Sequence, residues 1–195
     1  MEQRRRDKRQ LFLATAVRLF GQHGYATTTV PMVVAAANAS TGSFYSYFKN
    51  KEDVFAAALA DLGERIAAEI NQAVAGHAAP LAQMRAAVER LFLFLAEHPD
   101  EARILIVETS GLGGRLEEIR RGIIESHARS VQEMMSRHAL SPQPEVAAQC
   151  WVGAVYQAAW WWLGGDPARR LPATEMARAV AVYNLRAIGA DFSKL

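Results

Sequence analysis

The chain alternates between segments in which apolar residues return every three or four positions and short breaks rich in Gly, Pro, Ser and Thr. Residues 5–23 show this spacing first: Phe12, Leu19 and Phe20 share one helix face, and Gly24 follows where a helix C-cap favours glycine. The same spacing predicts further helices over residues 30–38, 41–48, 50–76, 80–98, 100–109, 115–139, 145–163 and 172–189. Strand signals, in which apolar and polar residues alternate between turns, are absent. We therefore expect an all-α fold of about nine helices.

Two of the predicted helices are short and lie close together in the sequence. Ser40 can cap the N-terminus of the helix over 41–48, and Asn38 before it tolerates the left-handed backbone that a tight turn requires. Pro31 fits the first turn of the preceding helix, where a missing N–H costs little. Two short helices joined by a tight turn form a helix-turn-helix, and in DNA-binding proteins the second helix enters the major groove. Helix pairs of this kind are common, so the pattern alone does not decide the function.

Charge is distributed unevenly along the chain although its net value is only +2. Residues 1–51 hold eight Lys/Arg against two Asp/Glu, a net charge of +6, whereas the remainder holds 14 against 18, a net charge of −4. A basic end on an acidic remainder indicates contact with a polyanion. Much of the positive charge lies in a short N-terminal arm, at Arg4, Arg5, Arg6, Lys8 and Arg9. Such an arm either contacts DNA phosphates or the minor groove, or is a solvated tail, and both interpretations remain open.

Composition and motif searches exclude several other classes. Hydrophobic residues make up 51% of the chain, which argues against disorder. Its single cysteine, Cys150, forms no disulfide within the chain and suits a reducing cytoplasm, where we expect the protein. The start of the chain is a poor signal peptide. Residues 146–165 are uncharged and long enough to span a membrane, but two glutamines interrupt them, which favours a helix buried in the protein.

Motifs for an enzyme or a metal site are also missing. The five histidines are scattered, and neither His-Glu-x-x-His nor Cys-x-x-Cys spacing occurs. No glycine-rich phosphate loop follows a predicted strand, and Cys150 lacks a local nucleophile signature. We therefore expect no catalysis, no cofactor and no metal ion; an enzyme would have to show turnover of some substrate.

The residues around the helix-turn-helix carry a more specific signal. They resemble the DNA-binding head of the TetR family of transcriptional regulators over about residues 9–55, whereas the rest of the chain matches that family only in length and helix count. The matching residues are Phe20, Gly24, Tyr25, Thr28, Thr29, Ala37, Ser40, Gly42, Phe44, Tyr45, Tyr47, Phe48, Lys51, Glu52 and Val54. Two positions depart from the family pattern: Asn38 replaces the usual turn glycine, and Pro31 replaces a polar residue that favours helix. We expect the turn to survive, because asparagine tolerates the same backbone conformation.

The resemblance implies a DNA-binding domain over residues 1–51 and a helical dimerisation and effector-binding domain over residues 52–195. In the head, Gly42 lets the backbone approach DNA closely, and hydroxyl groups at the start of the recognition helix face base edges or phosphates. The predicted DNA-binding residues are Thr28, Thr41, Gly42, Ser43, Tyr45, Tyr47 and Lys51, together with Arg5 and Arg6 of the arm. The alternatives are that both tyrosines are core aromatics, that Thr28 only caps a helix, and that Lys51 is merely solvated.

The recognition helix has an unusual composition. Residues 41–47 contain no Arg, Lys, Asn or Gln, which are the side chains that make paired contacts with one base. Base recognition would therefore come from hydroxyl groups, from apolar contacts with thymine methyl groups and from DNA shape. We expect modest specificity for each half-site, so that dimerisation matters more.

The family resemblance also implies roles for the body. Its last two helices form the dimer in this family, which suggests the interface residues Val155, Tyr156, Ala159, Trp162 and Tyr183. Its middle helices surround an effector, which suggests a pocket formed by Phe92, Ile104, Glu108, His127, Met134 and Trp151, although apolar residues on such helices are more often simple core. These features predict a homodimeric repressor on a palindromic operator, released by a small hydrophobic effector. Two alternatives remain: a DNA-binding relative without an effector, and a partner-binding module that has lost DNA affinity.

Overall fold

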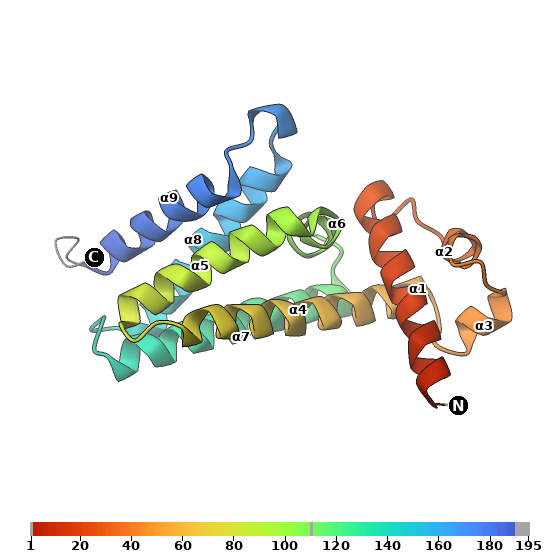
Figure 1. The fold of residues 1–195 in the computed structure, drawn as a ribbon, viewed down its shortest axis with the longest axis horizontal. Coiled ribbons are helices and arrows are strands. Elements are labelled where there is room, and N and C mark those ends of the chain that lie inside the picture. Colours follow the sequence, from red (N-terminus) through yellow and green to blue (C-terminus); the bar gives the residue numbers. More distant parts are fainter. Residues whose placement is uncertain (1, 110, 190–195) are drawn as a thin grey trace. The chain divides into compact units, whose positions relative to one another are not determined.

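A computed structural model describes residues 2–109 and 111–189, and it confirms the all-α prediction. The helices of this described part are α1 (Glu2–His23), α2 (Val30–Ala36), α3 (Thr41–Tyr45), α4 (Lys51–Ala75), α5 (Pro80–Glu97), α6 (Pro99–Arg103), α7 (Gly114–Arg137), α8 (Pro144–Gly164) and α9 (Ala173–Ala187) (Figure 1). Their contacts divide the chain into two compact units. The first runs to Gly63 and includes His98–Arg120, whereas the second comprises Glu64–Glu97 and the chain from Arg121 onwards. The predicted boundary after residue 51 divides the chain by function. The first compact unit is larger than the predicted DNA-binding head, because it also includes residues 52–63 and 98–120.

Aromatic side chains form the core of the first unit around α1. Phe12 packs edge-on against Phe44 of α3, with 5.5 Å between ring centroids, and Phe20 packs edge-on against Phe55 of α4 at 4.8 Å. All four rings are fully buried. Burying large aromatic rings stabilises a small helical unit strongly, and edge-on geometry adds to that effect. Phe44 thereby anchors α3 to the core, and the rest of α3 lies at the surface of the unit.

The turns of the first unit follow the sequence prediction. Gly24 has φ +82° and Asn38 has φ +48°, so both occupy the left-handed region that each residue type was expected to allow. Pro31 lies in the first turn of α2, as expected. The helix predicted over 41–48 is shorter than expected, because α3 ends at Tyr45 and the next residues form a turn.

The helix predicted over residues 100–109 is divided into two parts. After α6, the backbone widens into one turn of π-helix, η1 (Ile104–Glu108). Helix α6 lies directly on α1: a Cβ atom added to Gly21 would be only 2.5 Å from the Cβ of Asp100. A glycine at position 21 is therefore required for this close helix contact, which the sequence analysis did not identify.

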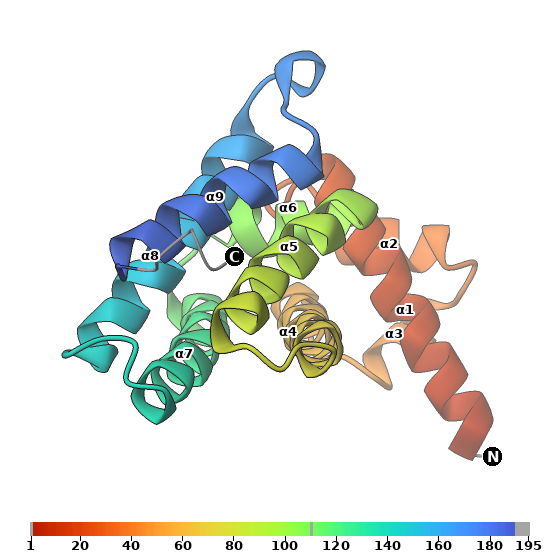
Figure 2. The same ribbon diagram turned by 60° about the vertical axis from the view of Figure 1, so that its left-hand side comes forward.

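The second unit is built from α5, α8, α9 and the adjoining parts of α4 and α7. Helix α9 packs against both α5 and α8, and it lies along α8 in Figure 2. Asn184 of α9 is buried and donates a hydrogen bond from Nδ2 to the Trp151 carbonyl of α8, at 3.1 Å. A short 3-10 helix, η2 (Pro167–Arg169), which the sequence analysis did not predict, connects α8 to α9. No helix in the described residues has the length and apolar character needed to cross a membrane.

Candidate nucleic-acid interface and internal cavity

The N-terminal end of α3 forms an exposed polar surface. Ser40 caps the helix, because its Oγ accepts a hydrogen bond from the Ser43 N–H at 3.2 Å. Thr41 and Gly42 are exposed, and Tyr45 is 54% exposed, whereas Ser43 is half-buried. A Cβ atom added to Gly42 would meet no atom within 4 Å. Nothing within the described chain therefore requires glycine at this position, which is the property expected where an outside molecule approaches the backbone.

Tyr47 and Ser46 follow α3 and flank this surface. The Tyr47 ring is half-buried and lies 5.9 Å from the Phe12 ring, so its aromatic body belongs partly to the core. Ser46, which the sequence analysis did not single out, is exposed, and its Oγ donates to the Gly42 carbonyl at 3.0 Å. Lys49 was also missed: it is exposed beyond α3 and would add a positive charge near the hydroxyl groups. The position of this lysine in the loop before α4 could have identified it from the sequence as a possible phosphate contact.

Thr28 does not lie on this surface. Its side chain is fully buried, and its Oγ donates to the carbonyl oxygens of Gly24 at 2.8 Å and of Leu19 at 3.2 Å. The hydroxyl group that caps α2 belongs to Thr29, whose Oγ accepts from the Met32 N–H at 3.4 Å. A phosphate contact by Thr28 is therefore incompatible with its burial, because the side chain holds the turn after α1 closed.

Lys51 is held by the same turn. Its Nζ donates to the carbonyl oxygens of Tyr25 at 2.8 Å and of Ala26 at 3.3 Å, and it lies 4.3 Å from the centre of the Tyr25 ring. Burial, together with the negative charge of Glu52, raises the pKa of Tyr25. Lys51 is thus more than a solvated lysine. It links the start of α4 to the α1–α2 turn, and an ammonium group has three hydrogen atoms to donate.

The basic arm is helical in the structure. Arg5 and Arg6 lie on the exposed first turns of α1, and Arg9 lies over the Phe48 ring at 5.4 Å. The arm is therefore a helical extension of α1, and its contact with DNA stays a prediction. Asp53 fixes the start of α4: it accepts from the Lys49 N–H and pairs with Arg115 at 3.2 Å, and both interactions lower its pKa.

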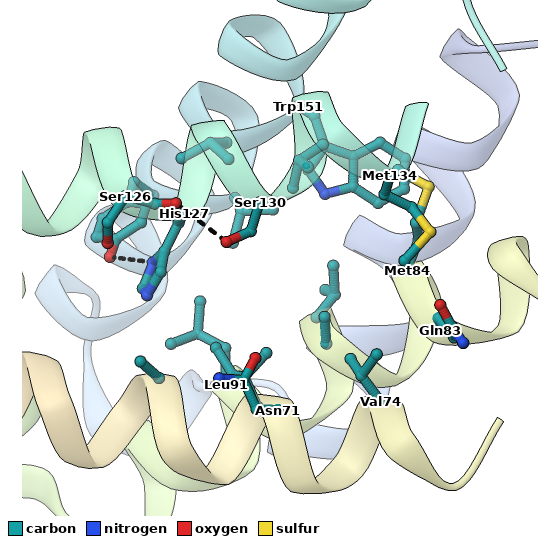
Figure 3. A pocket seen from close by; sticks show the side chains of 18 residues that line it. Asn71, Val74, Gln83, Met84, Leu91, Ser126, His127, Ser130, Met134 and Trp151 are labelled. Carbon is teal, nitrogen blue, oxygen red and sulfur yellow. Dashed lines mark hydrogen bonds between the residues drawn. The ribbon is translucent and has the colours of Figure 1, made fainter. Parts of the chain in front are cut away.

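The second unit contains a cavity of about 360 Å³ between α4, α5, α7 and α8 (Figure 3). Three of the predicted pocket residues, His127, Met134 and Trp151, lie in its lining. The complete lining also includes Ala67, Ile70, Asn71, Val74, Gln83, Met84, Ala87, Val88, Leu91, Ser126, Ser130, Val131, Val152, Val155 and Tyr156. The sequence analysis missed most of these, because periodicity shows which helix face is apolar but not where packing leaves a space.

The other three predicted pocket residues lie elsewhere. Phe92 is fully buried against the Trp162 ring, 5.7 Å away. Ile104 and Glu108 belong to η1 in the first unit. Glu108 accepts a hydrogen bond from the Tyr25 N–H at 2.9 Å and pairs with Arg103 at 3.0 Å. Its carboxylate is thus used to hold the α1–α2 turn and does not face the cavity.

His127 forms a polar pair with Tyr156 in the lining of the cavity. Its Nδ1 lies 3.0 Å from the Tyr156 hydroxyl oxygen, whereas its Nε2 is buried and has no hydrogen-bond partner in the described part of the chain. Figure 3 draws the His127 ring on α7 among the side chains that line the cavity. Burial lowers the pKa of His127, so the ring is neutral at neutral pH.

A shallow groove of about 500 Å³ runs along the outer faces of α8 and α9. Trp161 and Tyr183, which are 63% and 66% exposed, lie in its lining. The remaining lining residues are small or apolar apart from one glutamine: Ala154, Gln157, Ala158, Met176, Ala179 and Val180. Of the predicted interface residues only Tyr183 is on this face, since Ala159 and Trp162 are buried and Val155 and Tyr156 line the cavity. Among the described residues, no cluster of three or more His, Cys, Asp or Glu side chains is arranged to hold a metal ion.

Comparison with known proteins assigns both parts of the chain. The model of the bacterial regulatory proteins of the tetR family matches residues 7–58, and that of a tetracyclin repressor-like C-terminal domain matches residues 80–183. The chain belongs to the TetR family. This TetR-family chain is therefore a helix-turn-helix transcriptional regulator, and its first three helices form the DNA-binding motif.

Individual relatives of this TetR-family regulator agree with the assignment. The uncharacterized HTH-type transcriptional regulator YhgD of Bacillus subtilis is 43% identical over 49 residues, which span 25% of this chain and only 26% of that protein. FadR from Bacillus subtilis, solved with stearoyl-CoA, superimposes with a TM-score of 0.79 at 17% identity and covers 90% of this chain and 96% of FadR. AibR, solved with isovaleryl coenzyme A and operator DNA, gives 0.72 at 21% identity, with 90% and 97% covered. The structural likenesses establish the fold.

Proposed function

We propose that this regulator is a homodimeric repressor that binds a palindromic operator through α3 and releases it when a small apolar effector occupies the cavity. The observation that carries the DNA part is Gly42, an exposed helical glycine that no contact among the described residues requires. A bare backbone at the start of a recognition helix allows close approach to a phosphate or a base edge. Thr41, Ser43, Tyr45 and Tyr47 lie on or beside this surface.

Recognition of the operator depends on weak contacts in each half-site. The α3 segment offers hydroxyl groups and no side chain that makes paired contacts with a base, so discrimination between sequences is modest for one head. Arg5, Arg6 and Lys49 add exposed positive charges for the phosphate backbone. The ammonium group of Lys51 already donates to two backbone carbonyl groups, so only its remaining N–H can contact a phosphate. Two heads on a two-fold symmetric operator combine two modest recognition events into one specific complex.

The groove on α8 and α9 supports dimerisation with a second copy of the chain. Large exposed aromatic residues beside alanines provide anchors and allow helices to approach closely, as interface cores require. A two-fold axis would bring the same helices of two chains together, which gives a four-helix contact. The proposed interface keeps Tyr183 and adds Trp161, Ala158 and Met176.

The dimer has a direct test with a matched control. Trp161→Ala and Tyr183→Ala, measured by sedimentation equilibrium, are expected to raise the dimer dissociation constant at least tenfold each, the loss of about 1.4 kcal/mol or more that hot-spot aromatics produce. Trp160→Ala is the control, because Trp160 is 48% exposed but lies outside the groove. Equal effects of all three substitutions would reject this interface.

The cavity favours an effector over the alternative of a regulator without one. Its volume falls within the range of small-molecule pockets, and most of its lining is apolar. FadR and AibR were each solved with an acyl-CoA, which makes that class one candidate for this chain.

The experiment for the DNA function is fluorescence anisotropy with DNA from the upstream region of the protein's own gene and with shuffled DNA of equal length. Affinity for the upstream DNA is expected to exceed that for shuffled DNA and to fall steeply as salt rises. Tyr45→Phe, which removes only an exposed hydroxyl group, is expected to weaken binding. Equal affinity for both DNAs, insensitive to Tyr45→Phe, would favour the partner-binding alternative.

A further inference from the structure

We propose that the part of the effector enclosed by the cavity is uncharged and carries one hydrogen-bond acceptor oxygen, which binds Nε2–H of His127. The proposal rests on the effector function proposed above and adds the chemistry of the ligand. The ligand class is a neutral carbonyl compound with an apolar tail, such as an ester, a ketone or a lactone.

The lining of the cavity excludes a charged ligand group. None of its 18 residues is Asp, Glu, Lys or Arg. Arg90 of α5, which is not part of the lining, is paired with Glu69 and Glu97. A carboxylate or phosphate that entered would lose its hydration without gaining an ion pair, and this penalty is large in an apolar environment. A ligand with a charged group must therefore leave that group outside.

The His127–Tyr156 pair determines where the polar group of the ligand binds. A neutral imidazole has one donor and one acceptor nitrogen, and the hydrogen bond made by one nitrogen fixes the other. The Tyr156 hydroxyl lies 3.0 Å from Nδ1, and a phenol O–H is a good donor to an imidazole nitrogen. We assign the Tyr156 O–H as the donor, so that Nδ1 accepts and the proton lies on Nε2, which is buried and has no hydrogen-bond partner among the described residues. A buried donor without a partner is unfavourable, and an acceptor oxygen on the ligand removes that cost.

The remainder of the lining suits an apolar tail. Met84 and Met134 lie on the same side of the view in Figure 3, away from His127, and Trp151 lies between them and the histidine. Methionine side chains adapt their shape to different aliphatic or aromatic groups. The ligand would therefore place its oxygen at His127 and its tail toward the two methionines.

The test uses two probes with the same tail, methyl octanoate and octanoate, and a third, octanoyl-CoA. Binding is measured without DNA, from the change in tryptophan fluorescence, to which Trp151 of the cavity lining contributes, and from the rise in the unfolding temperature, at a pH at which octanoate is ionised. We expect methyl octanoate to bind at least a hundredfold more tightly than octanoate. Octanoyl-CoA, whose charged groups can remain outside the cavity, is also expected to bind more tightly than octanoate. Octanoate of equal or higher affinity than the ester, or no binding of the ester up to its solubility limit, would overturn the proposal.

Variants of His127 test the anchoring nitrogen separately. His127→Phe is expected to lower the affinity for methyl octanoate about three- to tenfold, which is the contribution of one buried hydrogen bond. His127→Gln retains an N–H donor and should retain most of that affinity. His138→Phe is the matched control, because His138 is exposed and outside the cavity. Unchanged affinity in His127→Phe would overturn the proposed anchor. Ester binding that leaves the DNA complex intact would instead contradict the proposed release mechanism alone, since ligand chemistry is measured without DNA.

Discussion

Glu108 offers the sharpest test of how the first unit holds its DNA-binding helices. Its carboxylate, 15% exposed, accepts from the Tyr25 N–H at 2.9 Å and pairs with Arg103, which is 52% exposed. Glu108→Ala removes both interactions and leaves the Tyr25 N–H without its acceptor. A hydrogen bond to a charged group contributes about 1.5–3 kcal/mol, so the free energy of unfolding should fall by about 2–3 kcal/mol. Arg103→Ala removes only an exposed ion pair, worth about 1 kcal/mol or less.

The measurement is urea unfolding at one fixed protein concentration, followed by circular dichroism and by tryptophan fluorescence. All four tryptophans, at positions 151 and 160–162, belong to the second unit, so the circular dichroism also reports the first unit whereas the fluorescence does not. Glu108→Gln keeps an acceptor oxygen and should lie between the other two variants. A Glu108→Ala effect no larger than that of Arg103→Ala would show that this carboxylate does not hold the α1–α2 turn.

Three further predictions concern single side chains. Gly21→Ala should lower the free energy of unfolding by about 1–3 kcal/mol in a denaturant titration, because the new methyl group overlaps Asp100 and α6 must move, despite the better helix propensity of alanine; a neutral or stabilising effect would contradict the close contact of α1 and α6. Lys51→Ala should cost about 1–2 kcal/mol even without DNA, through its contacts with Tyr25, and no loss would indicate a merely solvated lysine. Burial lowers the pKa of His127 in the folded chain, so as the pH falls this histidine is protonated first in the unfolded chain. The contribution of His127 to the free energy of unfolding should therefore decrease as the pH drops through about 6.5 and stay constant above it. His127→Phe should remove that part of the pH dependence, measured by thermal unfolding.

Local signals predicted much of the fold. Gly24, Asn38 and Ser40 each occupy the turn or cap position that their backbone and side-chain preferences predict. Such preferences act within a few residues, so the sequence alone reveals them. The family resemblance identified the hydroxyl-bearing residues of α3 for a similar reason. A short motif with fixed spacing has a fixed local geometry.

Features that depend on packing between distant segments could not be predicted in this way. Thr28 resembles a helix cap in the sequence, yet neighbouring Thr29 caps α2 while Thr28 is buried. Glu108 resembles a polar pocket residue, but the π-helical turn places it beside Tyr25, which lies 83 positions away. The family resemblance suggested Tyr156 for the dimer interface, whereas its side chain pairs with His127 of another helix, a contact that no local pattern reveals.

If α3 presents a bare backbone to DNA at Gly42, Gly42→Ala should disturb DNA binding while it leaves the fold intact. The added methyl group meets no atom within 4 Å in residues 2–109 and 111–189, so the variant should be as stable as the original chain or more stable by up to about 1 kcal/mol. Gly122→Ala is the matched control, an exposed glycine of α7 that likewise has open space around it. The account predicts that Gly42→Ala lowers affinity for the upstream DNA about tenfold or more in the anisotropy measurement, while Gly122→Ala leaves it unchanged. A Gly42→Ala variant that binds this DNA as tightly as the original chain would contradict the account.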